Sequence, residues 1–193
     1  MKKKLLAFVM AATMVFSLAA CGSSSSNDSS DSDSAQSGDE VQTFKLGSIG
    51  PLTGDYAIYG MAVVQGAELA VNEINASDSK IKFEFQKQDD EGDGEKAVNA
   101  YNTMMDHGLQ VLVGPTTTGA SIAVSSVVNE DRTFMLTPSG SSTDIIDGKD
   151  NVFQVCFTDP NQGTGAADYM AENMSGAKVA VIYQNDIAYS QGI

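Results

Sequence analysis

Apolar and polar residues recur along residues 44–183 with two periods, one typical of strands and the other of helices. Short apolar runs that predict β-strands lie at 44–49, 81–85, 109–113, 134–136, 152–157 and 178–183. Between them, apolar residues recur every three or four positions at 63–74, 97–105, 120–128 and 163–174, as on one face of a helix. This alternation predicts an α/β fold with a mostly parallel sheet and helices on both of its faces.

The pattern also predicts which helical positions face the sheet and where one helix ends. In the first helix the expected inward face consists of Val63, Gly66, Ala67, Ala70, Val71 and Ile74. Gly108 follows the second helix and predicts its C-terminal cap, because glycine adopts the left-handed conformation that such caps require.

The first 42 residues do not share this pattern. A basic start, Met1–Lys4, precedes the uncharged apolar segment Leu5–Ala20, which is short for a membrane span and typical of a secretory signal at residues 1–20. The order Leu-Ala-Ala-Cys ending at Cys21 resembles a bacterial lipobox, in which the cysteine becomes the lipidated first residue; cleavage of an ordinary signal near Ala20 is the alternative. Residues 21–42, rich in serine and aspartate, predict a disordered tether.

Composition excludes several partners. The net charge is −14, and removal of the three lysines of the signal lowers it to −17. A surface this acidic repels nucleic acid and anionic lipid headgroups, so we expect neither as a partner. Of the two cysteines, Cys21 belongs to the lipobox, and Cys156, within the apolar run VFQVCF, is expected to be a small buried core residue. No disulfide is therefore expected.

In open parallel sheets, ligands bind beyond the carboxyl ends of the strands, so we expect the ligand-binding residues in the loops that follow the strands. The loop after the first strand, Gly50–Gly60, contains Tyr56 and Tyr59, which either line a pocket or pack against the sheet. The loop after the second strand contains Asp89, Asp90 and Glu91, a set that could hold a metal or serve in acid–base chemistry. Because no histidine accompanies these acids, we interpret them as a solvated acidic edge.

The loop after the third strand, VGPTTTGAS, has the glycine spacing of a phosphate-binding P-loop, but Ala120 stands where that motif requires lysine. We therefore expect no nucleotide. Threonine hydroxyls followed by a helix N-terminus suit a single carboxylate; simple N-capping by Thr118 is the alternative. The loop after the fourth strand, TPSGSSTD, is again rich in hydroxyls, and the two loops can converge on one small polar ligand. No nucleophile elbow, Cys/His pair or zinc spacing occurs, so we expect no enzyme, cofactor or metal.

Six segments in order between Lys45 and Gly192 carry a family resemblance. They are KLGSIGPLTGDYAIYG, GAELAVNEIN, VLVGPTTTGAS, FMLTPSGSS, VFQVCFTDPNQG and KVAVIYQNDIAYSQG. Together they resemble the solute-binding proteins of branched-chain amino acid ABC transporters, of the leucine/isoleucine/valine-binding type.

The resemblance implies a type I clamshell, with a first lobe at 43–159 and the start of a second lobe at 160–193. By motif position, Thr118 and Ser141 would bind the ligand carboxylate, and the Ser139 carbonyl would help hold the ammonium. Tyr59 would line the side-chain pocket, and Tyr189 would approach from the second lobe.

The implied function is that of a monomeric extracytoplasmic lipoprotein. It would be anchored to the membrane only through Cys21 and would deliver an amino acid, most simply leucine, isoleucine or valine, to an ABC permease. The alternatives are a sensor domain of the same fold for a receptor or regulator, and a binder of amides or urea. An enzyme using the acidic triplet with a metal is the third class, and dependence of stability on calcium or magnesium would favour it.

The sequence departs from the family pattern in three places. The segment ASDSK at Ala76–Lys80 replaces a glycine-rich turn, and Thr118 stands where serine is frequent. The sequence ends at Ile193, so the expectation is an incomplete second lobe without the acid that pairs with the ammonium. We therefore expect weak amino acid binding by this chain and exposed apolar faces at 163–174 and 178–183.

Overall fold

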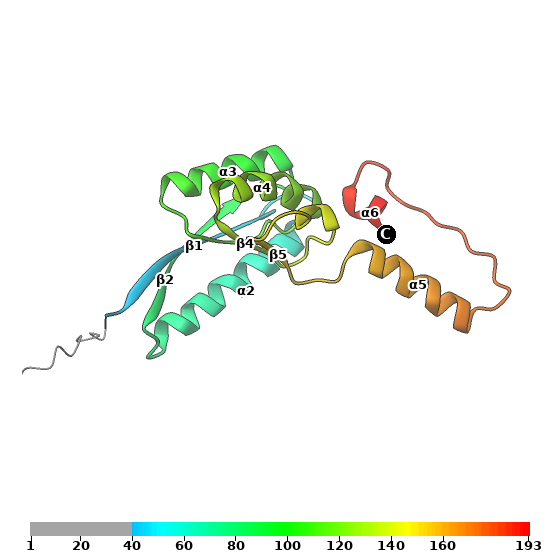
Figure 1. Ribbon diagram of the computed structural model, residues 1–193, viewed down its shortest axis with the longest axis horizontal. Coiled ribbons are helices and arrows are strands. Elements are labelled where there is room, and N and C mark those ends of the chain that lie inside the picture. Colours follow the sequence, from blue (N-terminus) through cyan, green and yellow to red (C-terminus); the bar gives the residue numbers. More distant parts are fainter. Residues whose placement is uncertain (1–39) are drawn as a thin grey trace, which may run out of the picture. The chain divides into compact units, whose positions relative to one another are not determined.

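The computed structural model describes residues 40–193, and a five-stranded parallel sheet is at their centre (Figure 1). The strands are β1 (Gln42–Gly50), β2 (Ile81–Asp89), β3 (Val111–Val113), β4 (Phe134–Thr137) and β5 (Val152–Gln154), in the spatial order β2-β1-β3-β4-β5. The helices are α2 (Ala57–Ala76), α3 (Gly94–Asp106), α4 (Thr118–Asp131), α5 (Asp159–Asn173) and α6 (Ala188–Gly192), with a 3₁₀ turn η1 (Thr143–Ile145). The predicted parallel sheet flanked by helices is confirmed.

The register of the strands aligns their carboxyl ends. Gly50 at the end of β1 lies opposite Asp89 at the end of β2, and Ser48 lies opposite Val113 at the end of β3. Val113 in turn lies opposite Leu136 in β4. The loops that follow these four strands therefore emerge along one edge of the sheet.

Helices α3 and α4 cover one face of the sheet and form the main core with it (Figure 1). Leu112 and Met135 from the sheet, Tyr101 and Met104 from α3, and Val124 from α4 are all fully buried. The Tyr101 hydroxyl lies 3.0 Å from Asp131 Oδ2 and 3.1 Å from Thr133 Oγ1, so the polar end of this buried ring is satisfied. The apolar periodicity of these two helices predicted their buried faces correctly.

The end of α3 also agrees with the sequence. Gly108 has a φ of 81°, and its amide donates to the Met105 carbonyl at 2.8 Å, while the Leu109 amide donates to the Met104 carbonyl at 3.1 Å. This pair of bonds is a Schellman motif, and it satisfies carbonyls that the helix end would otherwise leave open.

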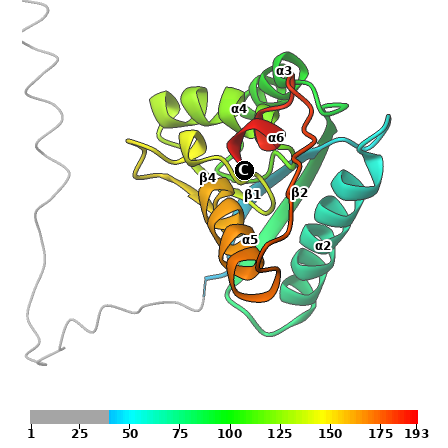
Figure 2. The same cartoon turned by 90° about the vertical axis from the view of Figure 1, so that its right-hand side faces the viewer.

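Helix α2 lies on the opposite face of the sheet, over β1 and β2, and its predicted inward face is only partly right (Figure 2). Val71 of the predicted face is buried, but so are Gly60 and Val64 outside it, whereas Gly66 and Ala70 of the predicted face are exposed. Alanine, valine and glycine occupy half of the positions of this helix and occur all around it, so hydrophobic periodicity alone does not select one side. The close approach of Gly60 to Pro51 selects it instead: a Cβ on Gly60 would lie 2.6 Å from the Pro51 nitrogen.

On the α2 side, strands β4 and β5 keep apolar side chains at the surface. Phe134 and Phe153 stack with their ring centroids 5.3 Å apart, and they remain 42% and 46% exposed. Alternation along each strand explains the arrangement, because Met135 and Val152, their chain neighbours, point to the buried side.

Three expectations for the C-terminal part require correction. Strand β5 ends at Gln154, because β4 ends at Thr137, its partner, and Val155 and Phe157 beyond it are 68% and 67% exposed. Residues 178–183 form no strand: no neighbouring strand among the described residues pairs with them, and Ile182 is 98% exposed. Helix α5 begins at Asp159 rather than Gly163, with Pro160 in its first turn, where proline is favourable.

The predicted signal at 1–20, the lipid site Cys21 and all but the last residues of the tether lie outside the described residues. Within residues 40–193, no helix has both the length and the apolar character that a membrane crossing requires.

Candidate functional site

The N-terminus of α4 and the loop after β4 meet through Thr118 and Ser141. Thr118 Oγ1 accepts a hydrogen bond from the Ser141 amide at 3.3 Å and lies 3.4 Å from Ser141 Oγ. Both residues are buried, with 5% and 2% exposure. The N-cap of α4 is Thr117, and no side chain caps this helix, so the alternative that Thr118 is an N-cap is wrong. We call Thr118, Ser139 and Ser141 the cradle.

A second layer of hydroxyls beneath the cradle fixes the two loops. Ser121 Oγ and Thr137 Oγ1 donate to the Pro115 carbonyl at 3.0 and 2.7 Å, and Thr137 Oγ1 accepts from the Gly140 amide at 2.9 Å. In the sequence, Ser121 stands at the hydroxyl position that ends a P-loop motif, and neither it nor Thr137 was assigned a role in ligand binding. The sequence could have indicated their role, because both are polar residues on faces that the apolar pattern predicts to be buried.

Ser139 joins the two loops as well. Its hydroxyl donates to the Thr116 carbonyl at 2.6 Å. Gly140 follows it at a position where a Cβ would lie 2.7 Å from Ser121 Oγ, so the close packing of the loop depends on this glycine. Three of the five predicted ligand-binding residues are therefore held together by direct contacts between the loops.

The two predicted tyrosines lie differently. Tyr59, in the first turn of α2, is 64% exposed, and among residues 40–193 no hydrogen bond or ring contact of its side chain reaches the cradle. Tyr189, in α6, is 44% exposed, and its hydroxyl donates to Gln162 Oε1 in α5 at 3.0 Å.

Asp159, which the sequence interpretation did not select, lies beside the cradle. Its amide donates to the Ser141 carbonyl at 3.0 Å, and its Oδ1 accepts from Gln162 Nε2 at 3.4 Å. A polar path thus runs from Thr118 through Ser141, Asp159 and Gln162 to Tyr189. No local pattern marks Asp159, because its burial arises from contacts with distant segments.

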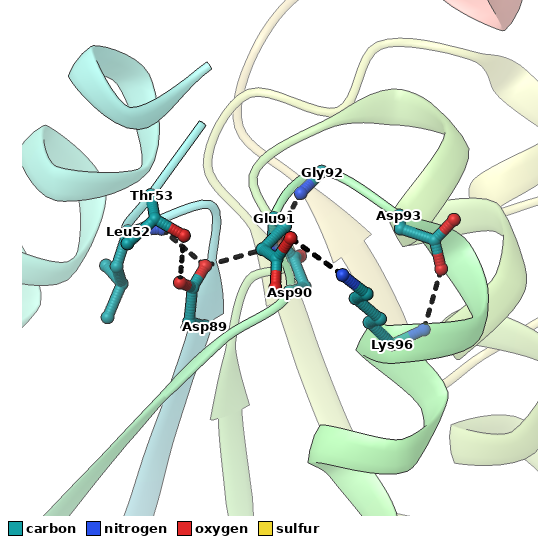
Figure 3. A network of polar contacts seen from close by, with 8 residues as sticks. All are labelled: Leu52, Thr53, Asp89, Asp90, Glu91, Gly92, Asp93 and Lys96. Carbon is teal, nitrogen blue, oxygen red and sulfur yellow. Dashed lines mark hydrogen bonds and ion pairs between the residues drawn. The ribbon is translucent and has the colours of Figure 1, made fainter. Parts of the chain in front are cut away.

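The acidic residues from Asp89, the last residue of β2, to Asp93 form a tight turn that connects neighbouring segments (Figure 3). Asp89 accepts from the amides of Leu52 and Glu91 at 2.8 and 2.9 Å and from Thr53 Oγ1 at 2.6 Å. Further along the turn, Glu91 pairs with Lys96 at 2.7 Å, and Asp93 caps α3 by accepting from the Lys96 amide at 2.9 Å. Within residues 40–193, no group of three metal-ligating side chains is suitably placed for a metal ion.

Asp90 overturns the interpretation of this turn as a solvated edge. It is fully buried; its Oδ1 accepts from the Gly92 amide at 2.8 Å, and its Oδ2 has no hydrogen-bond partner among the described residues. Burial raises the pKa of Asp90 to about 6, with the neighbouring Asp89 and Asp93 charges acting in the same direction. At Asp89, burial also acts to raise the pKa, but the hydrogen bonds from Thr53, Glu91 and Leu52 outweigh it and hold the pKa below its usual value.

Cys156 is not the buried core residue that its apolar neighbours predicted. It is a half-buried free thiol, and its Sγ donates to the Gly140 carbonyl at 3.2 Å, next to the cradle. Burial, with a smaller contribution from the Asp159 charge, raises the pKa of the thiol, which keeps it protonated and weakly nucleophilic at neutral pH.

A family model for periplasmic binding proteins matches residues 43–193. The chain belongs to the periplasmic binding protein family. A member from Brucella melitensis, "Leu/Ile/Val-binding protein homolog 3", is 38% identical over 153 residues, which make up 77% of this chain and 41% of that protein. The chain thus spans less than half the length of this relative.

Solved structures of family members agree with the fold. The branched-chain amino acid transporter substrate-binding protein LivJ from Streptococcus pneumoniae, in complex with isoleucine, superposes with a TM-score of 0.73 at 28% identity, over 78% of this chain and 44% of that one. A leucine-binding protein from Thermotoga maritima superposes with a TM-score of 0.71 at 26% identity, over 77% and 43%. The family resemblance inferred from the sequence motifs is confirmed.

Proposed function

We propose that this chain is an extracytoplasmic substrate-binding lipoprotein that captures a branched-chain amino acid for uptake by an ABC permease. The cradle carries the proposal, since the amide of Ser141 and the hydroxyls of Thr118 and Ser141 converge at the N-terminus of α4. The first amides of that helix and its positive dipole end add donors for one carboxylate. Relatives described as Leu/Ile/Val-binding proteins support the choice of amino acid.

In this proposal, the second lobe begins near Asp159–Pro160, and Tyr59 and Tyr189 contribute to the ligand pocket only after a hinge movement closes on the ligand. Ligand binding would then shift the population toward the closed form through contacts made from both sides. The exposure of both tyrosines is consistent with an open form.

A titration of isotope-labelled chain followed by amide NMR tests the proposal, because it detects millimolar as well as tighter binding. Leucine, isoleucine and valine should each shift the amide signals of Thr118 and Ser141. Leucinamide lacks the carboxylate and should leave them nearly unchanged. Equal shifts with leucinamide, acetamide or urea would instead identify an amide binder, and no shift with any of these compounds would contradict the cradle.

The lipid anchor is a separate part of the proposal and rests on the lipobox ending at Cys21. In a bacterial host fed labelled palmitate, the native chain should carry the label and sediment with membranes. Cys21→Ala should lose the label and either leave the membrane fraction or keep its signal. Cys156→Ala is the matched control and should be labelled normally; full labelling of Cys21→Ala would contradict the anchor.

A further inference from the structure

Strand β2 forms one edge of the sheet, because β1 is its only partner strand among the described residues. The Gln42 amide donates to the Lys80 carbonyl at one end of this pair, and the Asp90 amide donates to the Gly50 carbonyl at the other end. Even-numbered residues of the second segment therefore face β1, and successive residues of a strand direct their backbone groups to opposite sides. The amides and carbonyls of the odd-numbered residues within 81–89 consequently point outward, away from the sheet.

Asn75, at the C-terminal end of α2, occupies this outer edge at Phe83. Its Oδ1 accepts from the Phe83 amide at 2.8 Å, and its Nδ2 donates to the Phe83 carbonyl at 2.8 Å. A carboxamide carries a donor and an acceptor side by side, so this side chain makes both bonds that one residue of a neighbouring strand would make. Lys82 Nζ donates to the carbonyls of Asn75 and Ser77 at 2.9 and 2.7 Å, so the helix end that carries Asn75 is fixed against β2.

The rest of this edge is open. No described residue forms a hydrogen bond with the outward backbone groups of Phe85, Lys87 or Asp89. Unpaired backbone groups along an edge strand are a template on which another strand can pair. Asn75 therefore divides the edge and leaves only its C-terminal half uncovered.

The sequence of β2 is compatible with antiparallel pairing to a second copy of itself. If two copies pair with Phe85 at the centre, Phe85 lies opposite its counterpart and Phe83 lies opposite Lys87. This register gives a central aromatic pair and places no like charges opposite each other, and both features favour it. It requires the outward backbone groups of Phe83, which Asn75 occupies. A register centred on Lys87 avoids Asn75 but sets two lysines directly opposite, which is unfavourable.

We propose that Asn75 keeps two copies of this chain from pairing edge to edge through β2, by occupying the place at Phe83 that the second strand would take. The partner that it excludes is a second copy of the chain, in the antiparallel register centred on Phe85. This inference does not depend on the proposed ligand, because the cradle belongs to the loops after β3 and β4, on the other side of β1.

Three variants test the proposal. Asn75→Ala removes both bonds to Phe83 and retains α2, since Asn75 is exposed and alanine is the better helix former. Asn72→Ala is the matched control, because Asn72 is exposed in the same helix and its side chain has no hydrogen bond among the described residues. The double variant Asn75→Ala/Lys87→Pro lacks an outward N–H that the pairing requires, at a position where an edge strand tolerates proline.

Sedimentation velocity at increasing concentrations of the full chain measures association, and amide exchange followed by NMR locates it. In the native chain and in Asn72→Ala, the Phe83 amide should exchange slowly and the amides of Phe85 and Lys87 rapidly at every concentration. Asn75→Ala should shift toward a dimer as its concentration rises, and exchange at Phe85 and Lys87 should slow roughly 10-fold or more once most copies are paired. The double variant should sediment like the native chain.

Anchoring of α2 to β2 is the competing explanation for the two bonds of Asn75. If Asn75→Ala lowers only the melting temperature and sediments like the native chain, Asn75 is such an anchor and the inference is overturned. The inference also fails if the double variant associates as strongly as Asn75→Ala, because the contact then lies elsewhere. Slow exchange of the Phe85 and Lys87 amides in the native chain would show that the edge is already covered, and this measurement needs no variant to fold.

Discussion

Replacing Gly60 by alanine should destabilise the fold by about 3 kcal/mol, the upper part of the range for overpacked sites, although alanine is the better helix former. Gly60 lies within α2 and faces the turn after β1. A Cβ there would lie 2.6 Å from both the nitrogen and the carbonyl carbon of Pro51. These are backbone atoms and cannot move aside by changing a rotamer, so the helix itself would have to shift away from the sheet.

Gly66→Ala is the matched control in the same helix. Gly66 is exposed, and a Cβ on it would meet nothing within 4 Å. There the substitution should stabilise the chain by about 0.5–1 kcal/mol through helix propensity and lower entropy of the unfolded state. Chemical denaturation of the two variants measures both effects, and a stabilised Gly60→Ala variant would show that α2 does not pack closely on Pro51.

Thr118→Val should weaken leucine binding roughly 10- to 150-fold, because a hydrogen bond to a charged group contributes about 1.5–3 kcal/mol. Valine keeps the shape of threonine and removes the hydroxyl. The same change also removes the acceptor of the Ser141 amide, which should lower the free energy of unfolding by about 1 kcal/mol. Calorimetric or NMR titration and thermal melts on this one variant measure the two effects separately.

Thr103→Val controls for the substitution itself. Thr103 lies on the exposed side of α3, where its hydroxyl donates to the Asn99 carbonyl at 2.9 Å, so leucine affinity should not change. If Thr118→Val lowers the melting temperature and leaves the affinity intact, its hydroxyl only ties the β4 loop to α4, and the carboxylate site lies elsewhere.

Structural features that depend on local hydrophobic periodicity were predicted correctly from the sequence. The buried faces of α3 and α4, the cap at Gly108 and the two hydroxyl-rich loops after β3 and β4 all follow from residues close together in the chain. Once alternating elements imply a parallel sheet, the meeting of Thr118 with Ser141 follows too, because neighbouring strands end at the same edge.

Features that depend on contacts between residues distant in the sequence could not be predicted from the sequence. Residues 178–183 are as apolar as a strand, but strand formation needs a partner strand, and the described residues supply none. In the sequence, Asp159 and Asp90 resemble ordinary surface acids, yet both are buried. Asp159 contacts Ser141 and Gly192, and the amide of Asp90 donates to the Gly50 carbonyl, so both acids lie against segments that are distant in the sequence. The inward position of Gly60 in α2 likewise depends on its close contact with Pro51, which the composition of the helix does not reveal.

The acidic turn makes folding of this chain a proton-coupled reaction. Asp90 has an ordinary pKa of 3.8 and a folded pKa of about 6, so between these values folding takes up a proton. The stability that Asp90 contributes is complete below the lower value and is lost as the pH rises through the higher one. Asp89, with its lowered pKa, contributes stability above 3.8 that is lost at more acidic pH. The pKa shifts of these two adjacent carboxyls therefore make stability depend on pH in opposite directions. In a weakly buffered solution at about pH 5, uptake of a proton by Asp90 should make the solution more alkaline as the chain folds.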